Sequence, residues 1–339
     1  MNFSHIYYYI IYNACKKTIY HRATKQILLG GGMNTIMKKL KGVTVAMITP
    51  MDERGIFDPL SMSQLTDILV KKGVNALYPC GTTGEMSRLS VKERKTIAET
   101  VIEANRGRVT VFIHVGADSI PDTLNLAKHA YSAGADEVGI ITPLFLGCTP
   151  IEIENYYLTI ARNLPEDFPI YLYNIPQCSA NDLTANIASN IRRQCPNIIG
   201  IKYSYTDFNR TAEYLDIDKD FSVLHGCDRL FSSFLALGCD GTVSGVAGVF
   251  PEPFVNVYEA YKNKDLETMQ KWQKHCRRIC DILKCGSNMA YFKSGLEFRG
   301  IQAGHMRSPQ MDLDSRERRQ LNLNLKAFCL EAGLPSPIL

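Results

Sequence analysis

The stretch KKGVNALY, residues 71–78, carries a helical pattern to a glycine and passes directly into a short apolar run. Glycine takes the left-handed backbone at a helix end with the least strain, so this pattern predicts a helix that stops just before a strand. The same order returns in SAGADEVG, residues 132–139, and in LGCDGTVSG, residues 237–245. A chain that alternates helices with short buried strands is typical of the α/β class with a parallel sheet.

Eight apolar runs of strand length follow one another, each separated from the next by a helical pattern. They are Val43–Thr49, Ala76–Pro79, Val109–His114, Glu137–Ile141, Ile170–Asn174, Ile198–Lys202, Phe221–His225 and Gly241–Ser244. Ser90 with Glu93, and Thr149 with Glu152, form capping boxes that mark two helix starts. Eight strand–helix units predict a (β/α)8 TIM barrel. A doubly wound open sheet is the rival fold, but the chain has neither G-x-G-x-x-G after the first run nor a P-loop.

The chain ends differ from this repeating pattern. After Phe250 the pattern is wholly helical, over Pro253–Lys262, Leu266–Leu283, Asn288–Phe298 and Ser315–Ala332. We therefore interpret residues 41–262 as the barrel and residues 263–339 as a C-terminal helical extension. Residues 1–32 contain an apolar run too short to span a bilayer and lack the basic segment of a signal peptide. We expect them to be a leader outside the fold, either disordered or placed ahead of a true start at Met33.

Composition narrows the class of protein. The chain of 339 residues is 45% hydrophobic and 21% charged, which is ordinary for a globular protein. Its net charge of +4 comes without a long basic run, so we expect neither nucleic acid nor a membrane as a partner. The eleven cysteines form no C-x-x-C pair. Cys276, Cys280 and Cys285 are the closest group, and their helical pattern favours helix packing over a ligand set. Free thiols suit a reducing compartment, so we expect a cytoplasmic location.

Polar residues follow the predicted strands at the end where a barrel of this kind carries its chemistry. They are Thr82 and Thr83 in GTTGEM, His114, Tyr173 in YNIP, Lys202 and Ser204 in GIKYS, Gly226 and Asp228 in HGCD, and Ser244 with Gly245. Each has an ordinary explanation when taken singly, such as a helix cap, a turn glycine or a satisfied core histidine. Gathered at one end of one barrel, they favour a site.

Lys202 ends the apolar run of NIIGIKYSYTD, residues 197–207, and has two interpretations. Either its amine points into water, or it is held at a dry site and acts as a nucleophile. A lysine with its ordinary pKa of about 10.4 is protonated at neutral pH, whereas burial lowers the pKa and frees the amine to attack a ketone such as that of pyruvate. The turn Gly81–Gly84 offers N–H groups and hydroxyls to the carboxylate. Tyr173, on the neighbouring strand, is placed to relay protons.

GTTGE, YNIP and GIK, in this order and at these intervals, resemble the dihydrodipicolinate synthase / N-acetylneuraminate lyase family over about residues 42–300. The resemblance implies a homotetrameric (β/α)8 barrel with C-terminal helices, no metal or other cofactor, and a covalent imine with pyruvate. It implies that Lys202 forms the imine and that Tyr173 donates and accepts protons. Thr82 and Thr83 match the pair that orders the proton relay and holds the carboxylate of pyruvate, and Val243 matches a position that lines the pyruvate pocket.

Two positions depart from the synthase branch of that family. Synthases usually carry an arginine two residues after the YN-x-P proline, where this chain has Cys178, and they use TPYY where this chain has TPLF with Phe145. HVG at residues 114–116 is closer to the lyase branch. That branch usually has Ser-Thr in place of Thr82-Thr83, however, and the 2-keto-3-deoxy sugar acid aldolases fit comparably.

The region of Gly226, Asp228, Arg229 and Ser244 bears on the second substrate. Gly226 and Asp228 match sugar-hydroxyl ligands of the lyase branch, whereas that branch has an acidic residue in place of Arg229. Arg229 either contacts a carboxylate or is a solvated charge at a helix start. We predict reversible aldol cleavage of a 2-oxo-3-deoxy sugar acid in carbohydrate metabolism, with condensation of pyruvate and aspartate semialdehyde as the alternative.

Two further readings come from other functional classes. A metal-dependent aldolase or hydrolase would use His114, His225 and Asp228 as ligands, which leaves the lysine without a role. A non-catalytic relative that only binds pyruvate would explain Phe145, but the presence of both Lys202 and Tyr173 argues against it.

Overall fold

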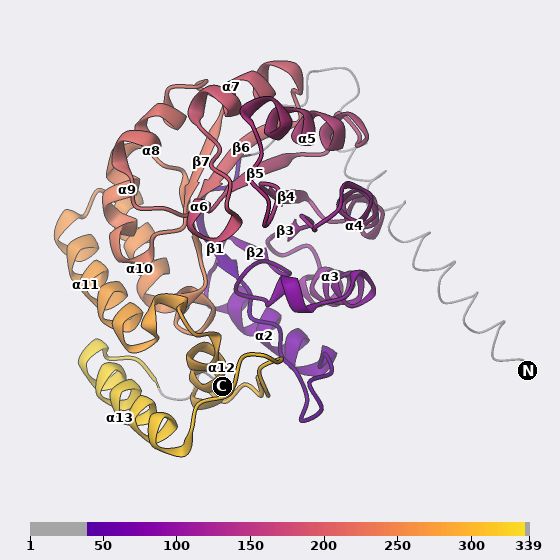
Figure 1. Ribbon diagram of the computed structural model, residues 1–339. Helices are drawn as coiled ribbons and strands as arrows, with labels where there is room; N and C mark the ends of the chain where they lie inside the picture. The colour runs from indigo at the N-terminus through magenta and orange to yellow at the C-terminus, as the bar shows by residue number, and fades with distance from the viewer. Residues whose placement is uncertain (1–38, 336–339) are drawn as a thin grey trace, which may run out of the picture.

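Eight parallel strands close into a barrel in chain order in the computed structural model, which describes residues 39–335 (Figure 1). The strands are β1 (Gly42–Ala46), β2 (Ala76–Tyr78), β3 (Thr110–His114), β4 (Glu137–Ile141), β5 (Ile170–Asn174), β6 (Ile198–Tyr203), β7 (Ser222–His225) and β8 (Gly241–Ser244). The barrel closes where β1 pairs with β8, with Val43 opposite Thr242. The predicted (β/α)8 fold is confirmed. The predicted leader, residues 1–32, lies outside the described residues.

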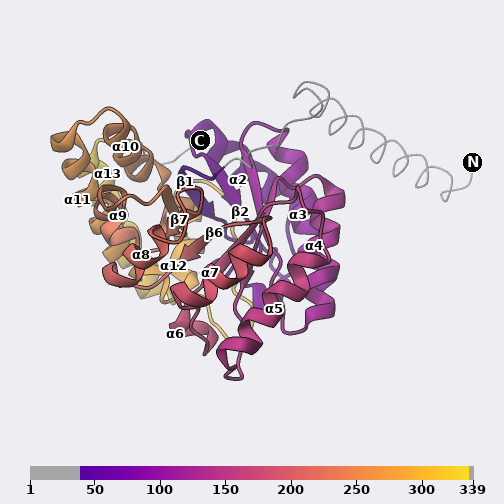
Figure 2. The same cartoon turned by 90° about the horizontal axis from the view of Figure 1, so that it is seen from above.

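Helices surround this barrel on all sides (Figures 1 and 2). They are α2 (Pro59–Lys71), α3 (Val91–Asn105), α4 (Ile120–Ala133), α5 (Pro150–Arg162), α6 (Pro176–Ser179), α7 (Ala185–Gln194), α8 (Phe208–Leu215), α9 (Phe231–Leu237) and α10 (Pro251–Lys262). Three more helices lie together on one side, α11 (Leu266–Ile282), α12 (Met289–Phe298) and α13 (Ser315–Ala332). Short 3₁₀ turns are η1 (Met86–Arg88), η2 (Asp228–Leu230), η3 (Val246–Gly248) and η4 (Lys284–Gly286). Among the described residues, no helix combines the length and the apolar character needed to cross a membrane.

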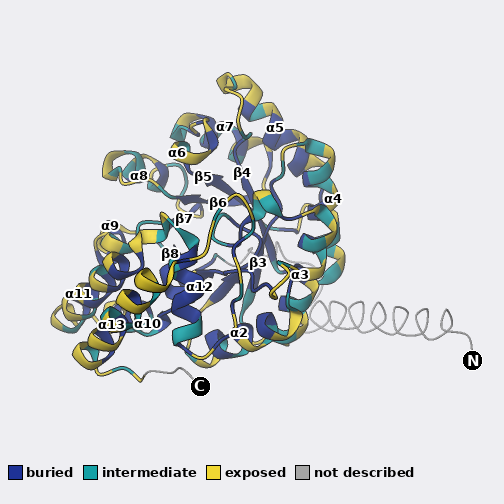
Figure 3. Ribbon diagram, turned by 60° about the horizontal axis from the view of Figure 1, so that its bottom comes forward, coloured by how far each residue is buried: buried dark blue, intermediate teal, exposed yellow. Residues whose placement is uncertain are grey.

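Burial explains why the strands read as continuous apolar runs. The strands are dark blue in Figure 3, whereas the outward faces of the helices are yellow. Side chains of a barrel strand point alternately to the interior and to the helices, and both environments exclude water. Aromatic rings fill much of the interior, where Tyr78 stacks on Phe112 at 4.3 Å between ring centroids and Phe112 meets Tyr171 at 5.2 Å. The barrel interior is therefore filled with side chains, and we look for an active site at the end of the barrel.

Several predicted boundaries differ from the structure by a few residues. The first strand was predicted to reach Thr49, but β1 ends at Ala46. Met47 and Ile48 stay buried in the core beyond the end of β1, and the Met47 backbone N–H still donates to the Tyr78 carbonyl of β2, so the apolar run continues past the strand. The predicted helix ends are better placed: Gly134 and Gly238 close α4 and α9 with φ of +92° and +117°.

A buried ion pair anchors the loop after β2 to the C-terminal helices. Glu85, the last residue of the GTTGE motif, has a left-handed backbone with φ of +61° and lies 3.0 Å from Lys293 Nζ of α12. Both side chains are almost fully buried, at 1% and 3% exposure. The backbone N–H of Arg307 also donates to Glu85. The loop that carries Thr82 and Thr83 is therefore held by contacts with residues more than 200 positions later.

This pair makes a specific stability prediction. Lys293→Met leaves the Glu85 carboxylate buried without its cation, and breaking a buried pair in this way costs about 3–5 kcal/mol. Urea unfolding followed by circular dichroism measures the loss. The matched control is Lys262→Met, because Lys262 and Glu259 form an exposed pair worth about 1 kcal/mol or less. Equal, small losses for both variants would contradict the anchoring role.

Candidate active site

Lys202 lies on β6 and its side chain is in the barrel interior. The strand register places it opposite Tyr173 of β5 and Leu224 of β7. The residue is only 4% exposed. Its Nζ lies 3.7 Å from the centroid of the Tyr173 ring and 4.7 Å from that of Tyr78. Of the two interpretations of Lys202, the structure therefore supports the dry site and excludes an amine in water.

Burial sets the protonation of this amine. It lowers the pKa of Lys202 to about 7, while the nearby Asp228 carboxylate works in the opposite direction. An ammonium between two rings gains some cation–π attraction, but this is smaller than the loss of hydration. At neutral pH a substantial fraction of Lys202 is consequently the free amine, which is the nucleophilic form.

Tyr173 links three of the predicted residues. Its hydroxyl lies 3.2 Å from Thr82 Oγ1 and is also hydrogen-bonded by Ser204. Burial raises the pKa of Tyr173 to about 12, while the Thr82 and Ser204 contacts oppose the rise. The phenol therefore keeps its proton at neutral pH and can pass it on only through a hydroxyl chain or to a strong base formed during a reaction.

Two predicted glycines allow close approach of neighbouring loops. A methyl group at Gly226 would lie 2.2 Å from Ser204 Oγ, and one at Gly245 would lie 2.8 Å from Thr83 Oγ1. Both separations are far below van der Waals contact, so any larger residue would displace the hydroxyl. The loops after β2, β6, β7 and β8 thus meet at one end of the barrel, as predicted from the sequence.

Asp228, in η2, is the acidic group of this region. The Ser244 hydroxyl and the Val246 backbone N–H hydrogen-bond its carboxyl group. Burial raises the pKa of Asp228 to about 7 in spite of these bonds and of the Lys202 charge. Its Oδ1 is buried and has no hydrogen-bond partner among the described residues. Such a group can accept a hydrogen bond from a hydroxyl. Val243 of β8, 3% exposed, lies in the interior cluster with Tyr78.

Three other residues from the sequence analysis are more exposed than Lys202. Arg229 is half-exposed and pairs with Asp281 of α11, so its guanidinium is directed away from the lysine toward the C-terminal helices. Cys178 is exposed on α6, and Phe145 is 90% exposed. Tyr78, the second ring beside Lys202, was not predicted. It ends an apolar run and carries no polar sequence signal that would have distinguished it from core.

The two histidines proposed as metal ligands, His114 and His225, take part in hydrogen bonds and ring packing within the fold. Arg94 donates to the backbone carbonyl of His114 at 2.9 Å and lies 3.2 Å from its Nδ1. The Cys227 backbone N–H donates to His225 Nδ1 at 3.1 Å, and the His225 ring stacks on Phe234. Across residues 39–335, no three His, Cys, Asp or Glu side chains are grouped so that they could hold a metal ion.

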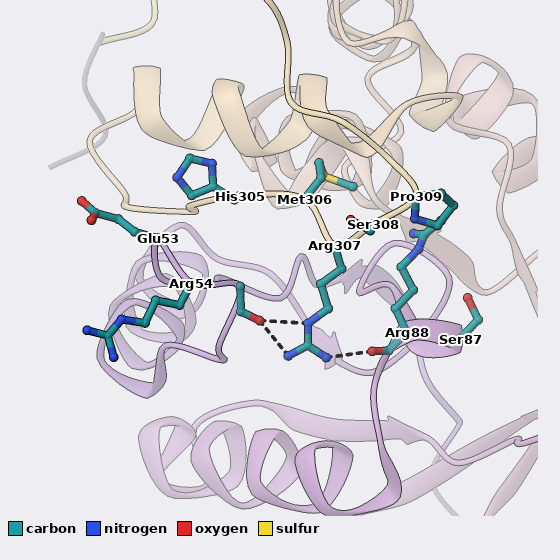
Figure 4. Close-up of a pocket in the computed structure, with 10 residues that line it drawn as sticks. Glu53, Arg54, Ser87, Arg88, His305, Met306, Arg307, Ser308 and Pro309 are labelled. Carbon is teal, nitrogen blue, oxygen red and sulfur yellow. Dashed lines mark hydrogen bonds between the residues drawn. The ribbon is translucent and has the colours of Figure 1, made fainter.

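A separate pocket of about 770 Å³ lies at the outer edge of the same loops (Figure 4). It is lined by residues 53–55, 87–88 and 305–309. Arg307 crosses it and donates to the Gly55 and Arg88 backbone carbonyls. Arg307 also pairs with Glu93, and His305 pairs with Asp312. Neither Lys202 nor Tyr173 lines this pocket, and its ionic contacts serve to fasten the C-terminal segment to the barrel loops.

Residues 39–328 match the model of the dihydrodipicolinate synthetase family. The chain belongs to this family, whose members are lyases and aldolases, and it is therefore an enzyme of this class. Two relatives represent different branches. The 4-hydroxy-tetrahydrodipicolinate synthase of Methanosphaerula palustris is 30% identical, over 85% of this chain and 99% of the relative. YjhH of Escherichia coli K12, named as a probable 2-dehydro-3-deoxy-D-pentonate aldolase, is 33% identical, over 68% of this chain and 78% of its own length.

Solved structures of this family share the fold. A sialic acid aldolase of Ruminococcus gnavus, solved as a catalytic lysine mutant, superimposes with a TM-score of 0.83 at 26% identity, over 89% of this chain and 99% of that chain. YagE of Escherichia coli K12, solved in complex with pyruvate, has a TM-score of 0.81 at 28% identity, over 86% and 99% of the two chains.

The buried amine predicts an unusual pH dependence of stability. The folded pKa of Lys202, about 7, lies below the ordinary value of 10.5, so the folded state is penalised while the ammonium must be buried. The penalty is full below about pH 7 and disappears as pH rises toward the unfolded value. Lys202→Met should therefore raise the free energy of unfolding most at about pH 6. Above about pH 7 this gain should shrink by about 1.4 kcal/mol for each pH unit toward pH 10.

Urea unfolding at several pH values measures this difference. Lys92→Met is the matched control, because Lys92 is an exposed lysine on α3. A Lys202→Met effect that does not change with pH would mean that the amine is not desolvated in the folded protein.

Proposed function

We propose that this protein is a class I aldolase that forms an imine between Lys202 and pyruvate and reversibly cleaves a 2-oxo-3-deoxy sugar acid into pyruvate and an aldehyde. The observation that carries the proposal is the Lys202 amine, buried beside the Tyr173 ring with its pKa lowered to about 7. Two neighbours support it by analogy, since YagE was solved with pyruvate and the sialic acid aldolase has a catalytic lysine.

In the cleavage direction, Lys202 Nζ attacks the C2 carbonyl of the substrate. Water leaves, and a protonated imine forms. The Tyr173 oxygen then takes the proton of the C4 hydroxyl while its own phenol proton passes to Thr82 and along the hydroxyl chain to water. The C3–C4 bond breaks, its electron pair moves into the imine to give an enamine, and the aldehyde departs. Protonation of the enamine at C3 and addition of water release pyruvate and restore the amine.

The pyruvate carboxylate is assigned to the turn after β2. Thr83 is positioned against Gly245, and the Glu85–Lys293 pair anchors this turn. Backbone N–H groups in such a turn, together with threonine hydroxyls, suit a carboxylate. A carboxylate there would leave C2 directed toward Lys202 and the remaining carbon chain toward Asp228 and Ser244.

Substrate class is inferred from the second half of the site. A dicarboxylate-building synthase needs a cation for its second carboxylate, but position 178 is a cysteine and Arg229 is already paired with Asp281. A sugar acid instead needs hydroxyl partners, which Asp228, Ser204 and Ser244 supply. Synthase activity is the second candidate, because the Methanosphaerula palustris relative carries that name.

Borohydride trapping tests the imine. Reduction of the protein in the presence of pyruvate should convert the imine into a stable amine and add a pyruvate-derived mass to the peptide that contains Lys202. Lys202→Ala should lose the adduct while remaining folded. An adduct that persists in Lys202→Ala, or that maps to another lysine, would disprove the assignment.

Removal of the phenol tests the proton relay. Tyr173→Phe keeps the ring that covers Lys202, so pyruvate trapping should stay close to wild type. Turnover should fall by roughly 10²–10⁴-fold, the usual contribution of a general acid–base group. Steady-state cleavage rates measure the effect, with Tyr205→Phe, an exposed tyrosine after β6, as the control. A near wild-type rate for Tyr173→Phe would show that the proton takes another route.

Substrate choice is tested by two assays on one protein. We expect pyruvate release from 2-keto-3-deoxygluconate or N-acetylneuraminate, and poor condensation of pyruvate with aspartate semialdehyde. One missing charged hydrogen bond, worth roughly 1.5–3 kcal/mol, corresponds to about a ten- to hundredfold loss. Cys178→Arg should recover part of the condensation rate. Efficient condensation by the unmodified protein without sugar acid cleavage would establish the synthase branch instead.

A further inference from the structure

Two thiols meet at the end of α11, beside the region assigned to the second half of the substrate. Cys280 lies in the last turns of α11 and is fully buried, whereas Cys285 lies in η4 and is exposed. The two thiols hydrogen-bond each other. The sequence pattern predicted helix packing for both. This holds for Cys280, but Cys285 lies beyond the helix end.

An unusual backbone turn brings the second thiol back to the first. Lys284, Cys285 and Gly286 all have left-handed backbone, with φ of +58°, +49° and +74°. Only the glycine takes this conformation without strain, and such strain persists where the surroundings hold it. The turn reverses the chain directly after α11 and returns Cys285 to the helix that it has just left.

The neighbouring groups shift the pKa values of the two thiols in opposite directions. The Arg229 guanidinium hydrogen-bonds Cys285 and also pairs with Asp281. The hydrogen bond from Cys280, and then Arg229, hold the pKa of Cys285 below its ordinary value, while burial and the nearby Asp281 oppose them. Cys280 is shifted in the opposite direction, so its pKa is raised. The exposed sulfur is thus the thiolate and the buried one is the thiol, which is the division of roles in a reactive cysteine pair.

We propose that Cys280 and Cys285 form a peroxide-responsive dithiol that closes to a disulfide. The Cys285 thiolate attacks one oxygen of a hydroperoxide, the O–O bond breaks, and the leaving oxygen takes a proton to become water or an alcohol. The Cys280 thiol then attacks the resulting sulfenic acid, forms the S–S bond and releases water. Two thiols lose two electrons in total, and the hydroperoxide gains them.

The disulfide would change the charges around Asp228 in the proposed site. The charge of Cys285 raises the pKa of Asp228, and closure to a disulfide removes that charge and the sulfur acceptor that faces Arg229. Gln273 of α11 donates to the Asp228 and Arg229 backbone carbonyls at 3.2 Å, so α11 is hydrogen-bonded directly to η2. Oxidation should therefore alter binding of the cleavage substrate more than capture of pyruvate at Lys202. This functional consequence rests on the proposed function, whereas disulfide formation does not.

A peptide map of the full-length protein tests the chemistry. After stoichiometric hydrogen peroxide, a non-reducing digest should show one peptide pair, or loop, that joins Cys280 to Cys285 and disappears with dithiothreitol. Cys280→Ala should stop at the first step and become labelled by dimedone at Cys285. Cys148→Ser, which changes a partly exposed thiol elsewhere, should leave the disulfide unchanged. Oxidation that is spread over other cysteines, or absence of the 280–285 link, would overturn the proposal.

Kinetics on the same oxidised sample test the consequence. We expect a severalfold rise in KM for the cleavage substrate, reversed by dithiothreitol, with unchanged borohydride trapping of pyruvate. If the reduced protein cleaves no sugar acid, the proposed substrate fails while the peptide map still decides the thiol chemistry. Unchanged KM in a fully disulfide-linked sample would overturn the link between the thiols and the site.

Discussion

The burial of one amine is the constraint on which the rest of the site depends. Lys202 is held inside the barrel between the rings of Tyr173 and Tyr78, where its charge is poorly solvated. The fold could avoid this cost by placing methionine or leucine at position 202 of β6. It keeps a lysine whose ammonium is penalised by burial, so that part of it is the free amine at neutral pH, the form that the proposed imine chemistry requires. The stability of the barrel and the chemistry of its amine are therefore opposed at this position.

The residues around Lys202 influence its pKa, cover its side chain and fix the neighbouring loop. Asp228 limits how far the pKa of Lys202 falls, and burial keeps Asp228 itself partly protonated near neutral pH. Tyr173 covers the lysine with its ring and reaches Thr82 with its hydroxyl. The loop that carries Thr82 is fixed in turn by the ion pair of Glu85 with Lys293. A chain of contacts therefore runs from the C-terminal helices to the Lys202 amine.

The sequence carries much of this arrangement in local patterns. Apolar runs, helix-closing glycines and capping boxes predict the barrel because each strand–helix unit obeys the same rules of burial and turn formation. Polar residues at strand ends predict which side chains share a face, since parallel strands end on the same side. The family resemblance adds roles for Lys202 and Tyr173 that composition alone does not supply.

Other features depend on contacts that no local pattern records. Arg229 was as compatible with a substrate carboxylate as with solvent, and its pairing with Asp281 depends on how α11 packs against η2. Tyr78 looks like core in the sequence and becomes part of the site only because β2 faces β6 across the barrel. A left-handed turn brings Cys285 back toward Cys280, and the residue types of this turn do not predict it.

The rate of pyruvate capture as a function of pH tests the central claim most directly. Imine formation needs the free amine, so its rate should rise with a midpoint near the Lys202 pKa of about 7 and then level off. Asp228→Asn should move the midpoint to lower pH, because it removes the carboxylate that stabilises the ammonium. Stopped-flow capture followed by borohydride quenching gives both curves. A midpoint near the ordinary lysine value of about 10.4 would show that the amine is solvated and contradict the account.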